Sequence, residues 1–423
     1  MATRPDTSPE WATDENFDAT GEAWDGLPTK VDPGAALREE GWEPEQRPAA
    51  EHVNFQLNLQ GAWLAFLMNV AIANWHEVPV IDGNGGELWG TSDMDLRCGV
   101  YVSTTSSGAG ALFLFGEFDS VSGDTRAAVS VAGGAWTDPP ETVDATADPV
   151  TVLAAVHDTT NGVLIVCGVN APADGMIFTR PAADAPLGTW TQRLSVANIT
   201  FRGLAHGASA SGAVTSIAVG ELTTTNDARI YSSDLGTGWT NRDTTANQPL
   251  YGVANKPGVC WVAVGDDTAG NAIIMRSADG ITWSTITHGL GVDTLRKIVW
   301  DARAGLFLAI GDNGSRCTSP DGTKWVDRTD TGVAWLASDP TDMATDGAGT
   351  ILVLSNSLGW RVYASTDGGL TFTAGHQIQR PGSPAWGDTT IRGLCWGGPS
   401  GWVIMGDVFP ALGAPVAWFS LAL

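Results

Sequence analysis

Four arginines and four acidic residues recur at matching places in a repeated unit of this sequence, and these residue types are suited to binding a ligand. The arginines stand at the start of an apolar segment: Arg97, Arg202, Arg296 and Arg392. The acids end the next apolar segment of the same unit: Glu117, Glu221, Asp312 and Asp407. A guanidinium binds a carboxylate through two parallel hydrogen bonds. Each arginine therefore either satisfies its own unit's acid or, with it, forms a polar pocket for a charged or hydroxylated ligand such as a surface glycan.

The unit that positions these pairs has four segments with the period of β-strands. Its clearest member is a run of aliphatic residues, usually ending in glycine and often in an acid, which recurs at 112–117, 164–168, 216–221, 261–266, 306–312, 351–356 and 402–407. One of these runs ends in Asp266 and has no matching arginine. Strands that are apolar on both faces are buried in the middle of a sheet. We expect these runs to be the second strands of the repeated sheets.

An aromatic residue leads the fourth segment of most units. These residues are Trp136, Trp190, Trp239, Trp283, Trp325 and Phe372. The missing copy is at the other end of the repeat, where Trp75 leads residues 75–80. A circular fold leaves no open edge if an N-terminal strand completes the last sheet. The sequence thus predicts an all-β fold over residues 75–423, a seven-bladed β-propeller closed by its N-terminal strand, with the arginine–acid pairs near one mouth of the central channel.

Between the third and fourth segments lie turns of the type Ser-x-Asp-x-Gly-x-Thr-Trp. Their aspartates are Asp234, Asp279, Asp321 and Asp367. Serine and aspartate side chains bond nearby backbone amides, and glycine adopts positive φ, so a structural role is expected. The motif resembles the Asp-box, or bacterial neuraminidase repeat. That resemblance implies a β-propeller and is compatible with both enzymes and binding proteins.

A sialidase-like, glycan-hydrolysing activity is an alternative that the Asp-box resemblance raises. Such enzymes use an arginine cluster together with a tyrosine nucleophile and a carboxylate partner. Arginines are present, whereas the tyrosines number four: Tyr101, Tyr231, Tyr251 and Tyr363. No pair of catalytic carboxylates can be singled out. We therefore predict a protein that is not an enzyme, with no catalytic residue assigned.

The composition of the sequence restricts the classes of partner and cofactor that the protein is expected to bind. The formal net charge is −25 and the pI is near 4.3, which disfavours nucleic acid and anionic membrane surfaces. The longest apolar stretch, 61–73, is too short to span a bilayer. The histidines and five cysteines lack metal-ligand spacing, and no nucleotide-binding glycine motif occurs, so neither a metal nor a cofactor is expected. We interpret the cysteines as buried thiols and the N-terminus as lacking a secretory signal.

The region before the repeat divides into two parts. Residues 1–50 are rich in proline and acids and carry Trp11, Trp24 and Trp42, which suit anchors on another protein's surface. Residues 51–74 are predicted to form a helix that is apolar around much of its circumference, with Trp63 and Phe66 among its aromatic residues. Such a helix needs covering, so we expect it to dock on a partner or to form a homo-oligomer.

The order of short sequence segments in this region, from ProGluTrpAlaThrAsp at 9–14 to TrpLeuAlaPheLeu at 63–67, resembles the N-terminal region of tailed-phage virion appendage proteins. The resemblance implies a structural protein located in the virion, made in the host cytoplasm and attached to other virion proteins through residues 1–74. A tail or fibre-type appendage that displays the propeller for host-surface attachment is the main hypothesis. A glycan-binding or glycan-hydrolysing propeller, and a capsid-attached decoration or head-fibre protein, are the alternatives.

Overall fold

The computed structural model describes the chain from residue 76 onward, with gaps. The described residues are 76–79, 96–103, 110–118, 125–131, 136–137, 143, 150–170, 172–182, 189–212, 214–243, 248–267, 269–329, 340–356, 360–373, 376–377, 391–406 and 416–420. The predicted arm and helix, with Trp11, Trp24, Trp42, Trp63 and Phe66, lie outside these residues, as do Trp75 and Asp407.

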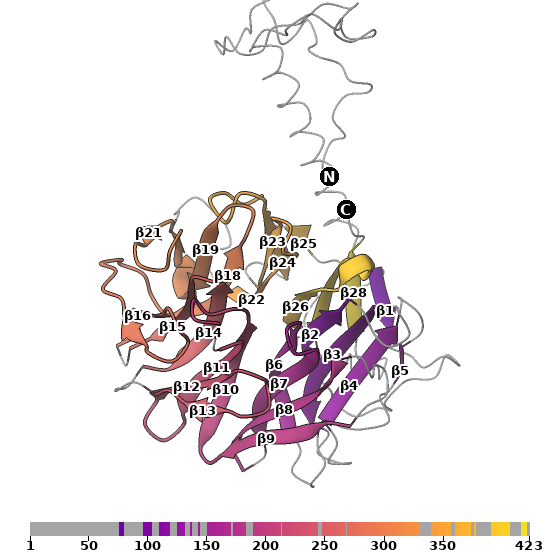
Figure 1. Ribbon diagram of the computed structural model, residues 1–423. Coiled ribbons are helices and arrows are strands. Elements are labelled where there is room, and N and C mark those ends of the chain that lie inside the picture. Colours follow the sequence, from indigo (N-terminus) through magenta and orange to yellow (C-terminus); the bar gives the residue numbers. More distant parts are fainter. Residues whose placement is uncertain are drawn as a thin grey trace, which may run out of the picture. The chain divides into compact units, whose positions relative to one another are not determined.

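The described strands form seven four-stranded antiparallel sheets, as Figure 1 shows. The innermost strands are β2 (Leu96–Val102), β6 (Val150–Asp158), β10 (Ile199–His206), β14 (Leu250–Lys256), β18 (Leu295–Asp301), β22 (Pro340–Thr345) and β26 (Ile391–Trp396). The second strands are β3 (Ala111–Phe118), β7 (Val163–Asn170), β11 (Ser216–Leu222), β15 (Cys260–Asp266), β19 (Leu306–Gly311), β23 (Ile351–Ser355) and β27 (Trp402–Gly406). They coincide with the aliphatic runs from which the repeat was predicted.

The outer half of each sheet holds the third and fourth strands. The third strands are β4 (Thr125–Val131), β8 (Gly175–Pro181), β12 (Asp227–Ser233), β16 (Ala272–Ser277), β20 (Arg316–Ser319), β24 (Arg361–Ser365) and β28 (Val416–Ser420). The fourth strands are β5 (Trp136–Thr137), β9 (Thr191–Val196), β13 (Thr240–Asn241), β17 (Ser284–Thr285), β21 (Val326–Asp327), β25 (His376–Gln377) and β1 (His76–Pro79). Most of these begin one residue after the aromatic residue that was expected to lead them.

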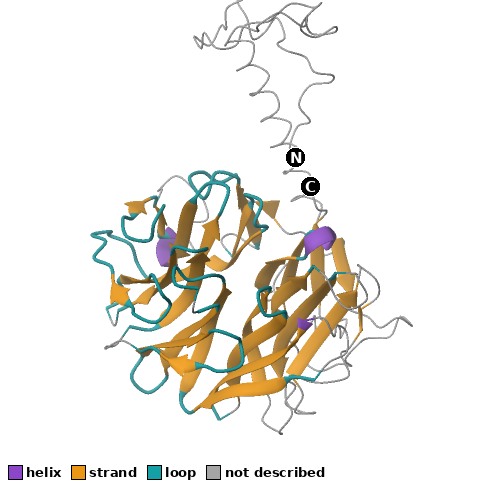
Figure 2. Ribbon diagram, viewed as in Figure 1, coloured by secondary structure: helices purple, strands orange, loops and turns teal. Residues whose placement is uncertain are grey.

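Two features close the sheets into a propeller. Strand β1 pairs with β28, so that His76 faces Phe419 and Pro79 faces Val416. Each inner strand also contacts the inner strands of both neighbouring sheets, and β2 contacts β26 as well as β6. The architecture is all-β: two short 3-10 turns, at Asp312–Gly314 and Gly398–Ser400, are among the few helical segments described (Figure 2). Within the described residues, no helix has the length and apolar character needed to cross a membrane.

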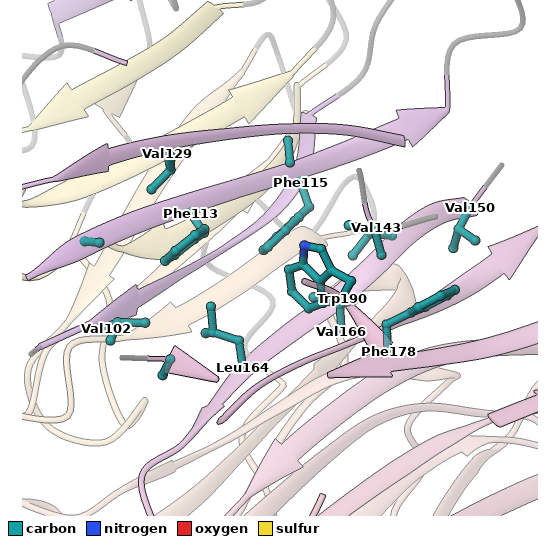
Figure 3. Packing of buried hydrophobic residues seen from close by; sticks show 14 of the residues in the cluster. Val102, Phe113, Phe115, Val129, Val143, Val150, Leu164, Val166, Phe178 and Trp190 are labelled. Carbon is teal, nitrogen blue, oxygen red and sulfur yellow. The ribbon is translucent and has the colours of Figure 1, made fainter. Parts of the chain in front are cut away.

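Neighbouring blades pack through the apolar faces of their inner and middle strands. Figure 3 shows the cluster between the first two complete blades, where Phe113 and Phe115 of β3 lie near Leu164 and Val166 of β7. Trp190, which leads into β9, meets Phe115 edge to face with ring centroids 5.7 Å apart. Aromatic pairs of this geometry add to the stabilisation from buried apolar area. The tryptophan-led segments therefore join blades together.

Every inner strand contains a β-bulge near its first residue. The register shifts there leave one residue unpaired with the second strand: Arg97, Leu153, Arg202, Tyr251, Arg296, Thr341 and Arg392. A bulge bends its strand and redirects the extra side chain. The four arginines predicted from sequence are thus all bulge residues.

The bulge explains the glycine that ends most second strands. A Cβ at Gly265 would lie 1.8 Å from the carbonyl oxygen of Pro249, and one at Gly311 would lie 1.8 Å from that of Thr294. The Pro249 carbonyl also accepts a hydrogen bond from the amide of Asp266, the acid that follows the glycine, at 3.2 Å. Glycine is required because the bulge turns this carbonyl into the sheet. The same contact holds the acid near the bulge.

The predicted aspartate turns make the expected hydrogen bonds in three of four cases. Asp279 Oδ1 accepts the amides of Ile281 and Thr282 at 2.8 and 2.7 Å, while the Ser277 hydroxyl accepts the Gly280 amide at 2.8 Å. Asp321 and Asp367 repeat this pattern. Within the described residues, the Asp234 carboxylate accepts no such bond. Instead its backbone carbonyl accepts the Thr215 hydroxyl at 2.9 Å.

A buried carboxylate joins two blades at the end of β6. Asp158 is 0% exposed and accepts the amides of Thr160 and Asn161 in its own hairpin at 3.0 and 2.9 Å. It also accepts the hydroxyls of Thr215 and Ser216 in the next blade, at 3.2 and 3.3 Å. A buried carboxylate is stable only when its acceptor positions are satisfied. Asp158 therefore links the two blades through polar groups, and Asn161 adds a hydrogen bond to the backbone carbonyl of Asp234 in the next blade at 3.3 Å.

Candidate functional site

The inner strands surround a cavity of about 180 Å³. Arg97, Arg202, Tyr251, Lys297 and Asp342 supply polar side chains to its lining. Its apolar lining includes Leu204, Val253, Ile298, Met343 and Leu394, each the second or third residue after the bulge of its strand. The lining of the cavity thus combines polar and apolar side chains, as that of ligand pockets commonly does.

Three of the predicted arginine–acid pairs are ion pairs in the structure. Arg97 bonds Glu117 through Nη2. Arg202 bonds Glu221 through Nη2 and through Nε, the latter at 3.0 Å. Their arrangement matches the prediction that each arginine meets the acid of its own blade.

The Arg296–Asp312 pair is bidentate. Nε donates to Oδ1 at 2.7 Å and Nη2 donates to Oδ2 at 2.6 Å. The hydrogen bond to Asp312 raises the pKa of Arg296 above its usual value. Arg392 occupies the corresponding bulge of β26, but its predicted partner Asp407 lies outside the described residues.

Tyr251 takes the place of an arginine in the blade that carries Asp266. Its hydroxyl donates to Asp266 Oδ1 at 3.2 Å, and Thr294 donates to the other oxygen of the same carboxylate at 3.0 Å. The guanidinium carbons of Arg202 and Arg296 lie 5.6 and 4.9 Å from the centroid of the Tyr251 ring. Guanidinium groups over an aromatic face are attracted by its quadrupole. Tyr251 therefore positions two arginines that come from its two neighbouring blades.

The acid–base state of this group favours protonated tyrosine. Burial, with the negative charges of Asp266 and Glu221, raises the pKa of Tyr251 to about 12. Burial also raises the pKa of Asp266, although hydrogen bonds from Thr294 and Tyr251 oppose this shift. Tyr251 is consequently a neutral hydrogen-bond donor near neutral pH, and ionising it as a nucleophile would be costly.

Asp342 connects three blades on the channel side. Its Oδ1 lies 2.8 Å from Lys297 Nζ of β18, and its Oδ2 accepts the backbone amide of Leu394 in β26 at 2.8 Å. Asp342 also accepts the amide of Met343 at 2.9 Å. This pair was not predicted from sequence. Its two members occupy the same register position, the residue immediately after the bulge, which is the signal that could have found it.

Tyr251 was also missed as a site residue. It stands between Leu250 and Gly252, as Arg202 stands between Phe201 and Gly203. Aligning the blades on this apolar-x-Gly pattern would have placed it at the bulge. Its residue type differs from the arginines at the corresponding position of other blades, so a repeated residue type does not reveal it.

The cavity also contains a thiol. Cys98 lines it, and all five cysteines are free, as predicted. Burial, and then the charge of Asp342, raises the pKa of Cys98 to about 12, so the thiol is protonated at neutral pH. Among the described residues, no group of three or more histidine, cysteine, aspartate or glutamate side chains is arranged to hold a metal ion.

The fold and the cavity together define the class of the protein: a β-propeller with a polar pocket where its inner strands meet. No protein-family model and no curated protein sequence matches the chain. Its fold is similar to YCF48 bound to a D1 peptide, at 13% identity over 82% of this chain and 96% of that chain, with a TM-score of 0.52.

Two lyase structures are similar to the same extent. A catalytically inactive virginiamycin B lyase from Staphylococcus aureus, solved with quinupristin, has 8% identity, a TM-score of 0.53 and coverage of 82% of this chain and 99% of that chain. A streptogramin B lyase has 10% identity, a TM-score of 0.54 and coverage of 83% and 99%. At such identities the similarity shows the fold alone.

Proposed function

We propose that this chain is a structural protein of a tailed-phage virion that displays a ligand-binding β-propeller for attachment to the host surface. The observation that carries the binding function is the cavity on which bulge residues of successive blades converge. Bulges commonly redirect side chains next to functional sites. The virion assignment is supported by the N-terminal sequence pattern at 1–74, which we assign to attachment on other virion proteins and to homo-oligomer formation.

The hydrogen bonds of the turns and the number of sheets support a more specific proposal for the fold, a seven-bladed β-propeller with Asp-box turns. The Ser-x-Asp turns at Asp279, Asp321 and Asp367 cap their own backbone in the way that the Asp-box pattern requires. Seven four-stranded sheets fit a seven-bladed member of that type.

Binding is favoured over hydrolysis by the state of the cavity's acids and tyrosine. Tyr251, with a pKa of about 12, is held as a phenol, and each described carboxylate of the site is engaged in hydrogen bonds or an ion pair. Such a site is organised to hold a ligand by hydrogen bonds. That the similar YCF48 structure contains a bound peptide supports the use of this fold for binding.

One set of virion particles tests both parts of the proposal. Particles assembled with the chain lacking residues 1–70 should contain none of it, whereas particles with the Arg202→Ala and Arg296→Ala double variant should contain normal amounts. The double variant should adsorb to host cells at least about tenfold more slowly, since guanidiniums at binding hot spots each contribute 2 kcal/mol or more. Normal incorporation of the truncated chain contradicts the anchor, and normal adsorption of the double variant contradicts the binding site.

The double variant must remain folded for that result to count. Arg202 and Arg296 have side chains 42% and 40% exposed, so their ion pairs are partly screened by solvent. We expect a loss of no more than about 2 kcal/mol of unfolding free energy for each substitution. Circular dichroism melts of the purified full chain check this directly.

A further inference from the structure

The charges around the cavity point to the class of its ligand. Each described cation in the lining already has a carboxylate: Arg97 has Glu117, Arg202 has Glu221 and Lys297 has Asp342. An anionic ligand would compete with these carboxylates for the same donors. It would also approach a protein whose formal net charge is −25. Like charges brought together at an interface weaken binding, so an acidic ligand is disfavoured at both long and short range.

The hydrogen-bonding capacity that remains suits hydroxyl groups. Arg202, which lines the cavity, uses Nε and Nη2 for its ion pair, so its Nη1 takes part in none of the hydrogen bonds among the described residues. Asp342 accepts three hydrogen bonds, one fewer than its two oxygens can take. A hydroxyl both donates and accepts, so it can bond to such donors and acceptors without breaking an ion pair.

The volume of the cavity and its apolar lining residues restrict the class of ligand further. A cavity of about 180 Å³ is somewhat larger than an engineered cavity of about 150 Å³ that holds benzene. It therefore has room for one six-membered ring. Leu204, Val253 and Ile298 are apolar members of the lining and offer contact surface for C–H groups. An uncharged sugar ring presents C–H groups on its faces and hydroxyls at its edge.

We infer that the cavity binds a single uncharged sugar ring, at the end of a glycan or free, and discriminates against acidic sugars. This inference rests on the proposed function, because it names the ligand class of the same site. The neutralising acids, Glu221 above all, are then the residues that determine specificity. Removing that acid should uncover Arg202 and change which sugar is preferred.

Matched sugars that differ in one charged group test the inference. Isothermal titration of the full chain would compare methyl galactoside with methyl galacturonide, and methyl glucoside with methyl glucuronide, at low and at physiological salt. We expect at least one neutral sugar to bind roughly tenfold more tightly than its acidic counterpart, in line with the cost of like-charge contacts. Its affinity should change less than about twofold with salt, since screening acts on charged partners.

The variant Glu221→Gln sharpens the test. It preserves the shape of the side chain and releases the charge of Arg202, so the acidic sugar should gain roughly tenfold while the neutral sugar changes by less than about threefold. Asp243→Asn is the matched control. Asp243 forms an ion pair with Arg229 at 3.3 Å, and neither residue lines the cavity. That control should leave both affinities unchanged.

The outcomes separate the ligand class from the function. Tighter binding of the acidic sugar by the unmodified chain, or binding of neither sugar, overturns the inference. So does a Glu221→Gln variant with unchanged preference. In each of those cases the proposed function still stands if adsorption to host cells depends on Arg202 and Arg296, and it falls only if adsorption does not.

Discussion

The two ends of the blades use carboxylates differently. At the turns between the third and fourth strands, Asp279 and Asp321 bond to backbone amides two and three residues ahead. At the opposite end of the inner strands, Glu221 and Asp312 bond to guanidiniums that stand on bulges beside the cavity. The first use needs only local sequence, whereas the second needs two strands in register. One end thus holds the shape of each blade through local bonds, and the other end carries the charged groups of the proposed binding site.

The largest effect is expected where the bulge excludes any side chain. Gly265→Ala places a Cβ 1.8 Å from the Pro249 carbonyl oxygen, so the backbone must move and the ladder between β14 and β15 is disturbed. We expect the free energy of unfolding to fall by about 3–5 kcal/mol. Gly238→Ala, whose Cβ would meet nothing within 4 Å, is the control and should change it by no more than about 0.5 kcal/mol. Equal losses in urea denaturation would show that the bulge does not demand glycine.

A smaller effect is expected for the polar contact between blades. Asp158→Ala removes a buried carboxylate and leaves the Thr215 and Ser216 hydroxyls of the next blade without it, at a cost of about 3 kcal/mol. Asp346→Ala is a matched change, because among the described residues the Asp346 carboxylate accepts the amides of Ala348 and Thr350 in its own hairpin and bonds no other blade. It should cost about 1 kcal/mol. Chemical denaturation compares the two, and a similar loss would mean that the contact across blades adds nothing.

The smallest effect belongs to the turns and depends on pH. Burial disfavours the ionised form of Asp279, but the amides of Thr282 and Ile281 lower its pKa to about 2, and Asp321 also has a pKa of about 2. Because these pKa values lie below the unfolded value of about 3.9, the stabilisation is complete above about pH 4 and is lost as pH falls through 2. Replacing both by asparagine makes the amide hydrogen bonds neutral and should lower the unfolding free energy by about 1 kcal/mol per turn at pH 6.

That loss should shrink as the solution is acidified towards pH 2, where the carboxylates of the unmodified chain are themselves protonated. Melting temperatures measured from pH 6 to pH 2 provide the test. Asp234→Asn is the control, since no amide hydrogen bond to that carboxylate is present within the described residues. If it reproduces the pH dependence of the double variant, the amide contacts are not its cause.

Much of the fold could be predicted because each repeated unit is recognisable from residues that are close together in the sequence. The aliphatic runs that became β3, β7, β11, β15, β19, β23 and β27 report burial on both faces of a strand. Residues of the turns could be assigned in the same way, since Ser277 and Asp279 bond groups within a few residues. The pairing of Arg97 with Glu117 followed from their positions in the repeated unit, at the start of the first strand and the end of the second strand.

The remaining contacts of the fold and of the site depend on the register between paired strands, which a local sequence pattern does not determine. The glycine before Asp266 reads as the end of a strand in the sequence, while its cause is a carbonyl on the neighbouring strand. Tyr251 and the Lys297–Asp342 pair share a position with other residues and differ from them in type. Asp158 meets residues more than fifty positions away. Contacts set by tertiary structure of this kind are visible only when blades are aligned on the bulge.

The pairing of β1 with β28 has a consequence for how the molecule reaches its native state. His76 lies opposite Phe419, so β1, which is synthesised early, can pair only after β28 has been synthesised near the end of the chain. Closing a loop of this length costs on the order of 5 kcal/mol in chain entropy. Blades made of consecutive strands can form as they are synthesised, but the ring stays open and β28 keeps a free edge until β1 returns. Closure is therefore expected to be the slow step, and the period before it is when the chain most needs protection from pairing with other chains.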